Sequence, residues 1–221
     1  MPVGVPEFAD NPEPRCPVVL LLDTSKSMSG DPIDALNAGL KRFKEAVSDD
    51  PTATLRVEVA IVAFGKSVRK MHDFKTIDQF EPPTLIAEGR TPMGEAINMA
   101  LDELENRKSE YKANDILYYR PWVFLLTDGA PTDEWDGAAK RVREGEDERK
   151  LSFFAVGVEG SDFETLTKIA PPNRPPRKLK GLEFNALFEW LSSSVSKVSE
   201  GEVGGQFIAL PPADGWAETT T

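Results

Sequence analysis

The sequence contains very few of the side chains that support redox or zinc chemistry. Among 221 residues there is one cysteine, Cys16, and one histidine, His72. A single cysteine excludes an intramolecular disulfide, and a single histidine gives no credible Ser–His–Asp arrangement. Neither residue lies near the oxygen-rich segments described below, so a zinc site of nitrogen and sulfur ligands is not expected there.

Long apolar runs are also missing. No run approaches the roughly 20 residues that a membrane helix needs. Residues 1–15 are rich in proline and acidic residues and lack the apolar stretch of a signal peptide. Together with the lone cysteine, these absences predict a cytoplasmic protein.

Basic residues are outnumbered by acidic ones. Lys and Arg number 26 and Asp and Glu number 37, which gives a net charge of −11. Nucleic acids and anionic membrane surfaces would repel such a protein, so we expect neither as a partner. The same balance is compatible with the binding of hard cations.

What the sequence does contain is an alternation of apolar strands and amphipathic helices. The runs 18–22 and 122–126 are continuously apolar, which is typical of strands buried on both faces of a parallel sheet. Residues 56–64 and 68–74 flank the turn Gly65–Lys66 and predict a hairpin, hence one antiparallel strand at the sheet edge. A further strand is expected at 151–158, and helices are expected at 31–47, 91–104, 135–149, 163–169 and 184–198.

This order of elements predicts an α/β fold. We expect a doubly wound, mostly parallel six-stranded sheet with one antiparallel edge strand and helices on both faces, a Rossmann-like arrangement. The expected organisation is an extended leader (1–17), one domain (18–199) and a C-terminal tail (200–221). Phe207–Leu210 and Trp216 in the tail could dock on a partner or pack back on the domain, and both alternatives stay open.

Oxygen-bearing side chains follow both apolar runs. Asp23, Ser25 and Ser27 alternate after the first run, Asp128 follows the second, and Thr91 precedes a helix. In open parallel sheets, ligands bind outside the carboxyl ends of the strands where the strand order reverses. Hydroxyl and carboxylate oxygens are the ligands that Mg²⁺ and similar hard cations prefer. The sequence therefore predicts a divalent-metal site at this edge.

Such a site would suit a carboxylate from another protein. With few carboxylates bound directly, the cation would keep residual positive charge, and an acidic side chain of a partner could complete its shell. A purely structural role, in which the two acids cap loops and the serines satisfy backbone groups, does not explain why both acids fall at the same edge.

The segments 23–27, Thr91 and 127–129 resemble, in order and spacing, the metal-ion-dependent adhesion site (MIDAS) of von Willebrand factor A domains. The resemblance extends over about residues 18–198. Segments 82–85, 89–94 and 120–133 also look like the bacterial TerY-like branch, whose members are associated with tellurite-resistance and stress-response systems.

The resemblance implies roles for five residues. Ser25 and Ser27 would bind the metal directly, and Asp23 and Asp128 would bind it directly or through water. Thr91 would move in or out as ligation changes. The expected cofactor is Mg²⁺, with Mn²⁺ or Ca²⁺ as alternatives, and the expected partner is a protein that supplies an acidic side chain.

One residue departs from the family pattern. Lys26 stands between the two serines, where the family often has glycine. A backbone with positive φ would be strained by a lysine, and an ammonium group near the cation would weaken binding. We expect Lys26 to point to solvent.

Two other functions are alternatives to a non-catalytic binding module. The first is a Mg²⁺-dependent phosphohydrolase using Asp23 as nucleophile, but Ser25 occupies the position where such enzymes carry a second acid. The second is a metal-buffering or oxyanion-handling protein, but a single weak site would buffer metal poorly. We expect no enzymatic activity.

Two further polar features have simpler interpretations. Asp133 is interpreted as a solvated loop acid or an outer neighbour of the metal. The basic residues 174–180 are interpreted as a solvated connection.

Overall fold

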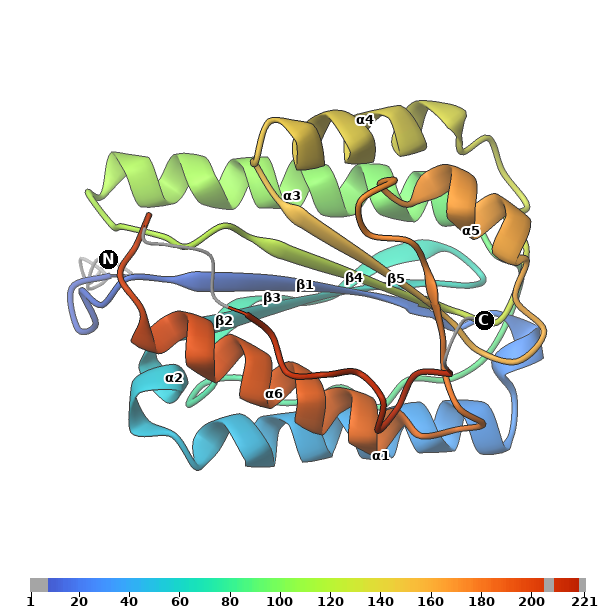
Figure 1. Ribbon diagram of the computed structural model, residues 1–221, viewed down its shortest axis with the longest axis horizontal. Helices are drawn as coiled ribbons and strands as arrows, with labels where there is room; N and C mark the ends of the chain where they lie inside the picture. The colour runs from blue at the N-terminus through green and yellow to red at the C-terminus, as the bar shows by residue number, and fades with distance from the viewer. Residues whose placement is uncertain (1–7, 205–208, 219–221) are drawn as a thin grey trace, which may run out of the picture.

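The computed structural model describes residues 8–204 and 209–218 of the chain. Strands and helices alternate along most of it (Figure 1). The strands are β1 (Cys16–Asp23), β2 (Val57–Phe64), β3 (Val68–Thr76), β4 (Trp122–Thr127), β5 (Ser152–Gly157) and β6 (Arg177–Lys178). The α-helices are α1 (Asp31–Ser48), α2 (Pro51–Arg56), α3 (Met93–Ala113), α4 (Asp136–Asp147), α5 (Phe163–Ile169) and α6 (Phe184–Glu200).

The predicted sheet is confirmed. Its six strands follow the order β3-β2-β1-β4-β5-β6. All neighbours are parallel except β2 and β3, which form the expected antiparallel hairpin at one edge. The chain moves from β1 to β2 on one side and later returns to β4 on the other side, so the strand order reverses between β1 and β4.

Both faces of the central strand are buried. Val18, Leu20 and Leu22 of β1 belong to the core under α1 and α6, whereas Val19 and Leu21 belong to the core under α3 and α4. Consecutive side chains of a strand point to opposite faces, which is why the run 18–22 has to be apolar at every position. Helices α1, α2 and α6 cover one face, and α3, α4 and α5 cover the other (Figure 1).

Helices α1 and α6 pack closely against each other. A Cβ atom added at Gly39 of α1 would lie 2.6 Å from the ring of Phe188 in α6, so a larger residue there would push the helices apart. Arg42 and Glu189 form an ion pair of 2.7 Å across the same interface. Among the helices in the described parts of the chain, none is long and apolar enough to cross a membrane.

Two features differ from the sequence-based expectations, and a third decides between two alternatives that the sequence leaves open. Helix α2 was not predicted, although Asp50 caps it by accepting bonds from two backbone amides. The sixth strand is the two-residue β6, within the stretch interpreted as a solvated connection. The tail does pack back on the domain at Trp216, which is 2% exposed; Phe207 and Ile208 lie outside the described residues.

Candidate metal centre

The predicted site residues lie at the point where the strand order reverses. Asp23 is the last residue of β1, and Asp128 directly follows β4. Because β1 and β4 are parallel neighbours, their carboxyl ends meet at one edge of the sheet. This is the position at which open α/β sheets bind ligands.

A chain of hydrogen bonds joins the serines to the second acid. The hydroxyl oxygens of Ser25 and Ser27 are 2.9 Å apart. The Ser27 hydroxyl donates to the Asp128 carboxylate at 2.7 Å, which leaves Ser25 as the donor to Ser27. The hydroxyl oxygen of Ser27 therefore lies within hydrogen-bond distance of two other oxygen ligands of the predicted set.

Asp23 lies behind this chain and is completely buried. One oxygen of its carboxylate accepts from the backbone amide of Ser25 at 2.8 Å, and the other accepts from the Thr127 hydroxyl at 2.5 Å. Thr127 is the last residue of β4 and is itself buried. Thr127 was not among the predicted site residues, although it lies beside Asp128 at the end of a buried strand.

Burial disfavours the charged forms of both acids. It raises the pKa of Asp23 to about 6, despite the opposing hydrogen bonds from Thr127 and Ser25, and the nearby charge of Asp128 adds to the rise. Burial also raises the pKa of Asp128, against the hydrogen bond from Ser27. A cation beside the two carboxylates would favour their charged forms.

Thr91 lies at the same site. A Cβ atom added at Gly129 would be 3.1 Å from the Thr91 hydroxyl oxygen, so these two residues are neighbours. The backbone amide of Thr91 donates a hydrogen bond to the Thr132 hydroxyl at 3.2 Å. The backbone carbonyl of Thr91 accepts one from the Thr132 amide at 2.9 Å. Thr91 is thus held against the loop that carries Asp128.

Asp133 has a different role from those considered for it. Its carboxylate accepts hydrogen bonds from the amides of Gly94 and Glu95, at 3.0 and 2.7 Å, and so caps the N-terminus of α3. The loop after β4 can approach so closely because residue 94 is glycine, where an added Cβ would lie 2.1 Å from the Glu134 carbonyl oxygen. Asp133 therefore helps to hold the helix that follows Thr91 beside the site.

Lys26 is exposed, as expected. It begins the short 3₁₀ helix Lys26–Met28, and its amide donates to the carbonyl of Gly89 at 3.2 Å. Among the described residues, the non-glycine residues with positive φ are Asp115 and Arg149. The backbone at Lys26 therefore does not need glycine, and the strain considered for this position does not arise.

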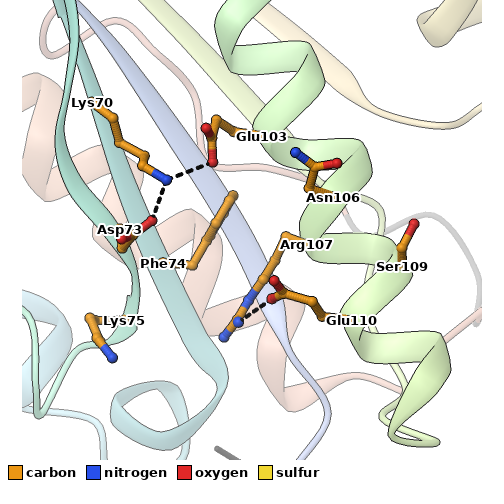
Figure 2. Close-up of a pocket in the computed structure, with 9 residues that line it drawn as sticks. All are labelled: Lys70, Asp73, Phe74, Lys75, Glu103, Asn106, Arg107, Ser109 and Glu110. Atoms are coloured by element: carbon orange, nitrogen blue, oxygen red, sulfur yellow. Dashed lines mark hydrogen bonds and ion pairs between the residues drawn. The ribbon is translucent and has the colours of Figure 1, made fainter.

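The structure also has a cavity away from these residues. It has a volume of about 640 Å³ and lies between β3 and α3 (Figure 2). Lys70 of β3 contacts Asp73 and Glu103, at 2.6 and 2.9 Å, and Arg107 contacts Glu110 at 2.7 Å. These side chains satisfy one another's charge, and none belongs to the predicted site.

The profile of the von Willebrand factor type A domain family matches residues 18–187, well over half of the chain. Comparison with curated proteins finds none that matches. Among solved structures, the pilus adhesin SpaC of Lactobacillus rhamnosus GG superposes with a TM-score of 0.66 at 15% identity, over 84% of this chain and 30% of that one.

Two further similar structures hold metal. The mussel byssus proximal thread matrix protein 1 with a zinc-occupied MIDAS motif gives a TM-score of 0.56 at 16% identity, over 83% of this chain and 48% of that one. The manganese-loaded TRAP protein of Plasmodium vivax superposes with a TM-score of 0.52 at 19% identity, over 78% of this chain and 71% of that one. This chain thus spans about half the length of the mussel protein, and at these identities the likeness shows the fold.

The profile match and the fold agree over the same stretch of the sequence. The chain belongs to the von Willebrand factor type A domain family.

Proposed function

We propose that this chain is a non-catalytic, metal-dependent protein-binding module. The observation that carries the proposal is the contact between two strand ends, in which Ser25, Ser27 and Asp128 form one hydrogen-bonded chain in front of the buried Asp23. The set consists of oxygen atoms alone, which suits a hard divalent cation.

The residues present fit such a cation. Ser25, Ser27 and Asp128 would hold it, with Asp23 behind them and Thr91 at the side. When bound, the cation would supply residual positive charge that attracts an acidic side chain of a partner. The donor chemistry suits Mg²⁺, with Mn²⁺ or Ca²⁺ as alternatives.

The geometry gives less support to a phosphohydrolase. A nucleophilic carboxylate must present an oxygen to the substrate. Asp23 is 0% exposed, and its two carboxylate oxygens accept hydrogen bonds from Ser25 and Thr127. Position 25 also lacks the acid that such enzymes use for proton transfer.

The proposal places the module in the cytoplasm, as a scaffold in a tellurite-resistance or stress-response system. The support for the system is the resemblance of segments 82–85, 89–94 and 120–133 to the TerY-like branch. The support for the compartment is the single cysteine, which is free and buried. The net charge of −11 favours protein partners over nucleic acid or anionic membranes.

The first test is calorimetric titration of Mg²⁺ and Mn²⁺ into metal-free protein. We expect one saturable site in the wild type and a loss of at least about ten-fold in affinity in Ser27→Ala, because even outer-shell changes cost 10–100-fold. Ser27 is exposed, so this variant should fold normally. Ser67→Ala, an exposed serine in the turn between β2 and β3, is the matched control.

The second test concerns the partner. An acidic peptide or protein captured by the wild type with Mg²⁺ should be lost with EDTA and with Ser27→Ala, but kept with Ser67→Ala. Capture that persists unchanged in EDTA and in Ser27→Ala would contradict the metal-bridged model. Phosphatase activity that disappears in Asp23→Asn would favour the enzyme instead.

A further inference from the structure

Three basic residues lie along one side of the metal centre. Lys26 lies between the two serines of the site, and Arg90 directly precedes Thr91. Lys66 lies in the turn after β2, the parallel neighbour of β1, and therefore at the same edge of the sheet. All three are exposed. We call Lys26, Lys66 and Arg90 the basic rim.

Backbone contacts hold the basic rim together. The amide of Lys26 donates to the carbonyl of Gly89 at 3.2 Å. The amide of Arg90 donates to the carbonyl of Gly65 at 3.3 Å. A Cβ atom added at Gly89 would lie 2.3 Å from the backbone nitrogen of Lys66, so these two segments touch. The three residues therefore share one fixed stretch of surface beside the metal ligands.

Two members of the basic rim have no ion pair. Lys66 contacts Glu88 at 3.4 Å, and Glu88 also contacts Arg69 of β3 at 3.8 Å. Among the residues that the structure describes, the side chains of Lys26 and Arg90 form neither an ion pair nor a hydrogen bond. Pairing with a neighbouring acid therefore accounts for Lys66, but not for Lys26 or Arg90.

These two unpaired cations would lie beside a bound metal ion. The carboxylates of Asp23 and Asp128 balance the charge of one divalent cation, so Lys26 and Arg90 are in excess. Like charges repel one another, and this repulsion weakens metal binding. A partner with a single acid would leave part of the excess uncompensated, whereas a second acid would compensate it.

Two acids close to the centre are engaged by helix N-termini. Asp133 caps α3, as described above. Asp31 lies in the first turn of α1, where the partial positive charge of the helix end attracts it. Their charges are therefore directed to the helices.

The opposite side of the centre is acidic. A Cβ atom added at Gly160 would lie 3.4 Å from the carbonyl oxygen of Asp128, so the loop after β5 adjoins the metal ligands. This loop carries Glu159, which is exposed, and Asp162, which caps α5. The surroundings of the metal centre are thus polarised, with the basic rim at the ends of β1 and β2 and acids at the end of β5.

We propose that the partner of the metal centre is a protein segment with at least two neighbouring acids, one for the cation and one for the basic rim. The inference rests on the proposed function, because the first acid is the one that completes the metal shell. The polarity sets the direction of the segment: its further acids lie over β1 and β2, away from Glu159. Such charge complementarity selects the partner more than it adds affinity.

The test measures the binding of two end-capped fluorescent peptides to the full-length protein by anisotropy, in saturating Mg²⁺. One peptide has three consecutive glutamates in a Gly-Ser background, and the other has Gln-Glu-Gln at the same positions. We expect the wild type to prefer the triple-acid peptide. The preference should shrink at 1 M NaCl, where the screening length is about 3 Å, and EDTA should abolish the binding of both peptides.

The decisive comparison is the same preference in a double variant, Lys26→Gln with Arg90→Gln. Both positions are exposed, so the fold should be kept. The preference should fall about five-fold, since one exposed ion pair changes an affinity by up to about that factor. Having three acids instead of one gives the same statistical advantage in every protein, so it does not affect this comparison. Calorimetry should show Mg²⁺ bound as tightly as in the wild type, or more tightly.

The matched control is Lys112→Gln. Lys112 is also exposed and without an ion pair among the described residues, and it lies in the last turn of α3. This helix starts beside the metal centre and runs along the sheet to its other end (Figure 1). The variant loses the same charge far from the site and should keep the wild-type preference.

The outcomes separate this inference from the proposed function. Peptide binding that is absent, or that persists in EDTA, would overturn the proposed function and this inference with it. Mg²⁺-dependent binding with the same preference in the wild type and the double variant would overturn this inference alone. A preference that is lost in the double variant and kept in Lys112→Gln supports it.

Discussion

The hydroxyl of Ser27 donates a hydrogen bond of 2.7 Å to the carboxylate of Asp128, although 101 residues separate the two in the sequence. The contact forms because β1 and β4 are adjacent parallel strands whose carboxyl ends deliver their loops to one edge of the sheet. The two oxygens approach closely enough to ligate the same cation. Several properties of the protein should therefore depend on this small group of atoms.

Divalent metal should stabilise the folded protein by mass action. A ligand that binds only the native state adds about 2.7 kcal/mol when its free concentration is 100 times its Kd. We expect Mg²⁺ or Mn²⁺ to raise the urea midpoint of the wild type and EDTA to reverse the change. Ser27→Ala should show little stabilisation over the same range of metal concentrations, and an equal effect in both proteins would place the metal elsewhere.

The metal-free protein should lose stability as the pH rises through the range in which Asp23 titrates. Burial raises the pKa of Asp23 from 3.8 to about 6, so between these values the folded state binds more protons than the unfolded state. Stability then falls as pH rises from about 4 to 6 and is lowest above that range. The full difference is on the order of 3 kcal/mol, at about 1.36 kcal/mol for each pH unit.

Asp23→Asn tests this directly, because it removes the charge and keeps the shape. In EDTA at pH 7 the variant should be more stable than the wild type to urea by about 1–3 kcal/mol, and the difference should shrink towards pH 4. The same variant should not bind Mg²⁺. A variant that is less stable than the wild type at pH 7 would mean that the loss of one of the two acceptor oxygens of Asp23 outweighs the removal of its buried charge.

Thr127 should act as a positioning residue for Asp23. Its hydroxyl donates to the Asp23 carboxylate at 2.5 Å and accepts from the Gly129 amide at 3.2 Å. Thr127→Val keeps the volume and removes both bonds, which should cost about 1–3 kcal/mol of stability. It should also weaken metal binding about ten-fold or more, whereas Thr127→Ser should restore most of the affinity; calorimetry of both variants checks this.

Much of the fold could be predicted because its central strands have a clear sequence signal. A strand covered on both faces has to be apolar throughout, as the runs 18–22 and 122–126 are. The strand β6 gives no such signal, because its two residues are basic and one of them is exposed. Helix α2 is also short, at six residues, and its only sequence signal was Asp50 followed by proline.

The candidate site likewise contains residues that could be placed from the sequence and residues that could not. Side chains that follow a strand end are placed by the topology, so Asp23 and Asp128 could be brought together from the sequence. The contacts made by Thr127 and Asp133 depend on where individual loops approach, and nothing in their spacing distinguishes a cap for α3 from a solvated acid. The docking of Trp216 likewise depends on tertiary packing against α6.

A buried ion network far from the metal centre should contribute strongly to stability. Glu58, the second residue of β2, is 2% exposed and pairs with Arg15 at 2.8 Å and Arg107 at 2.9 Å. It also accepts a hydrogen bond of 2.5 Å from Tyr111. Glu58→Gln removes the charge that compensates these guanidinium groups, so it should cost about 3–5 kcal/mol in urea unfolding.

The control for Glu58 is an acid that pairs with the same arginine at the surface. Glu110 contacts Arg107 at 2.7 Å and its side chain is 53% exposed, so Glu110→Gln should cost at most about 1 kcal/mol. Because Glu58 lies near the start of β2 and the metal centre lies at the carboxyl ends of the strands, folded Glu58→Gln should bind Mg²⁺ as the wild type does. Equal losses in the two variants would contradict the importance of burial.

Cys16 should report on the opening of the whole sheet. It is the first residue of β1 and is 0% exposed, and burial raises the pKa of its thiol to about 12. At pH 8 only roughly one thiol in ten thousand would be ionised in the native state, and the thiolate is the reactive form. Labelling by a disulfide reagent should therefore proceed through opened molecules, and its rate should follow their population.

Mg²⁺ at about 100 times its Kd should slow the labelling of the wild type about 100-fold, because a ligand that binds only the native state reduces the population of opened molecules. The labelling of Ser27→Ala should be almost unaffected by Mg²⁺. Labelling of the wild type in buffer at the rate seen in urea would show instead that β1 is accessible without opening of the sheet.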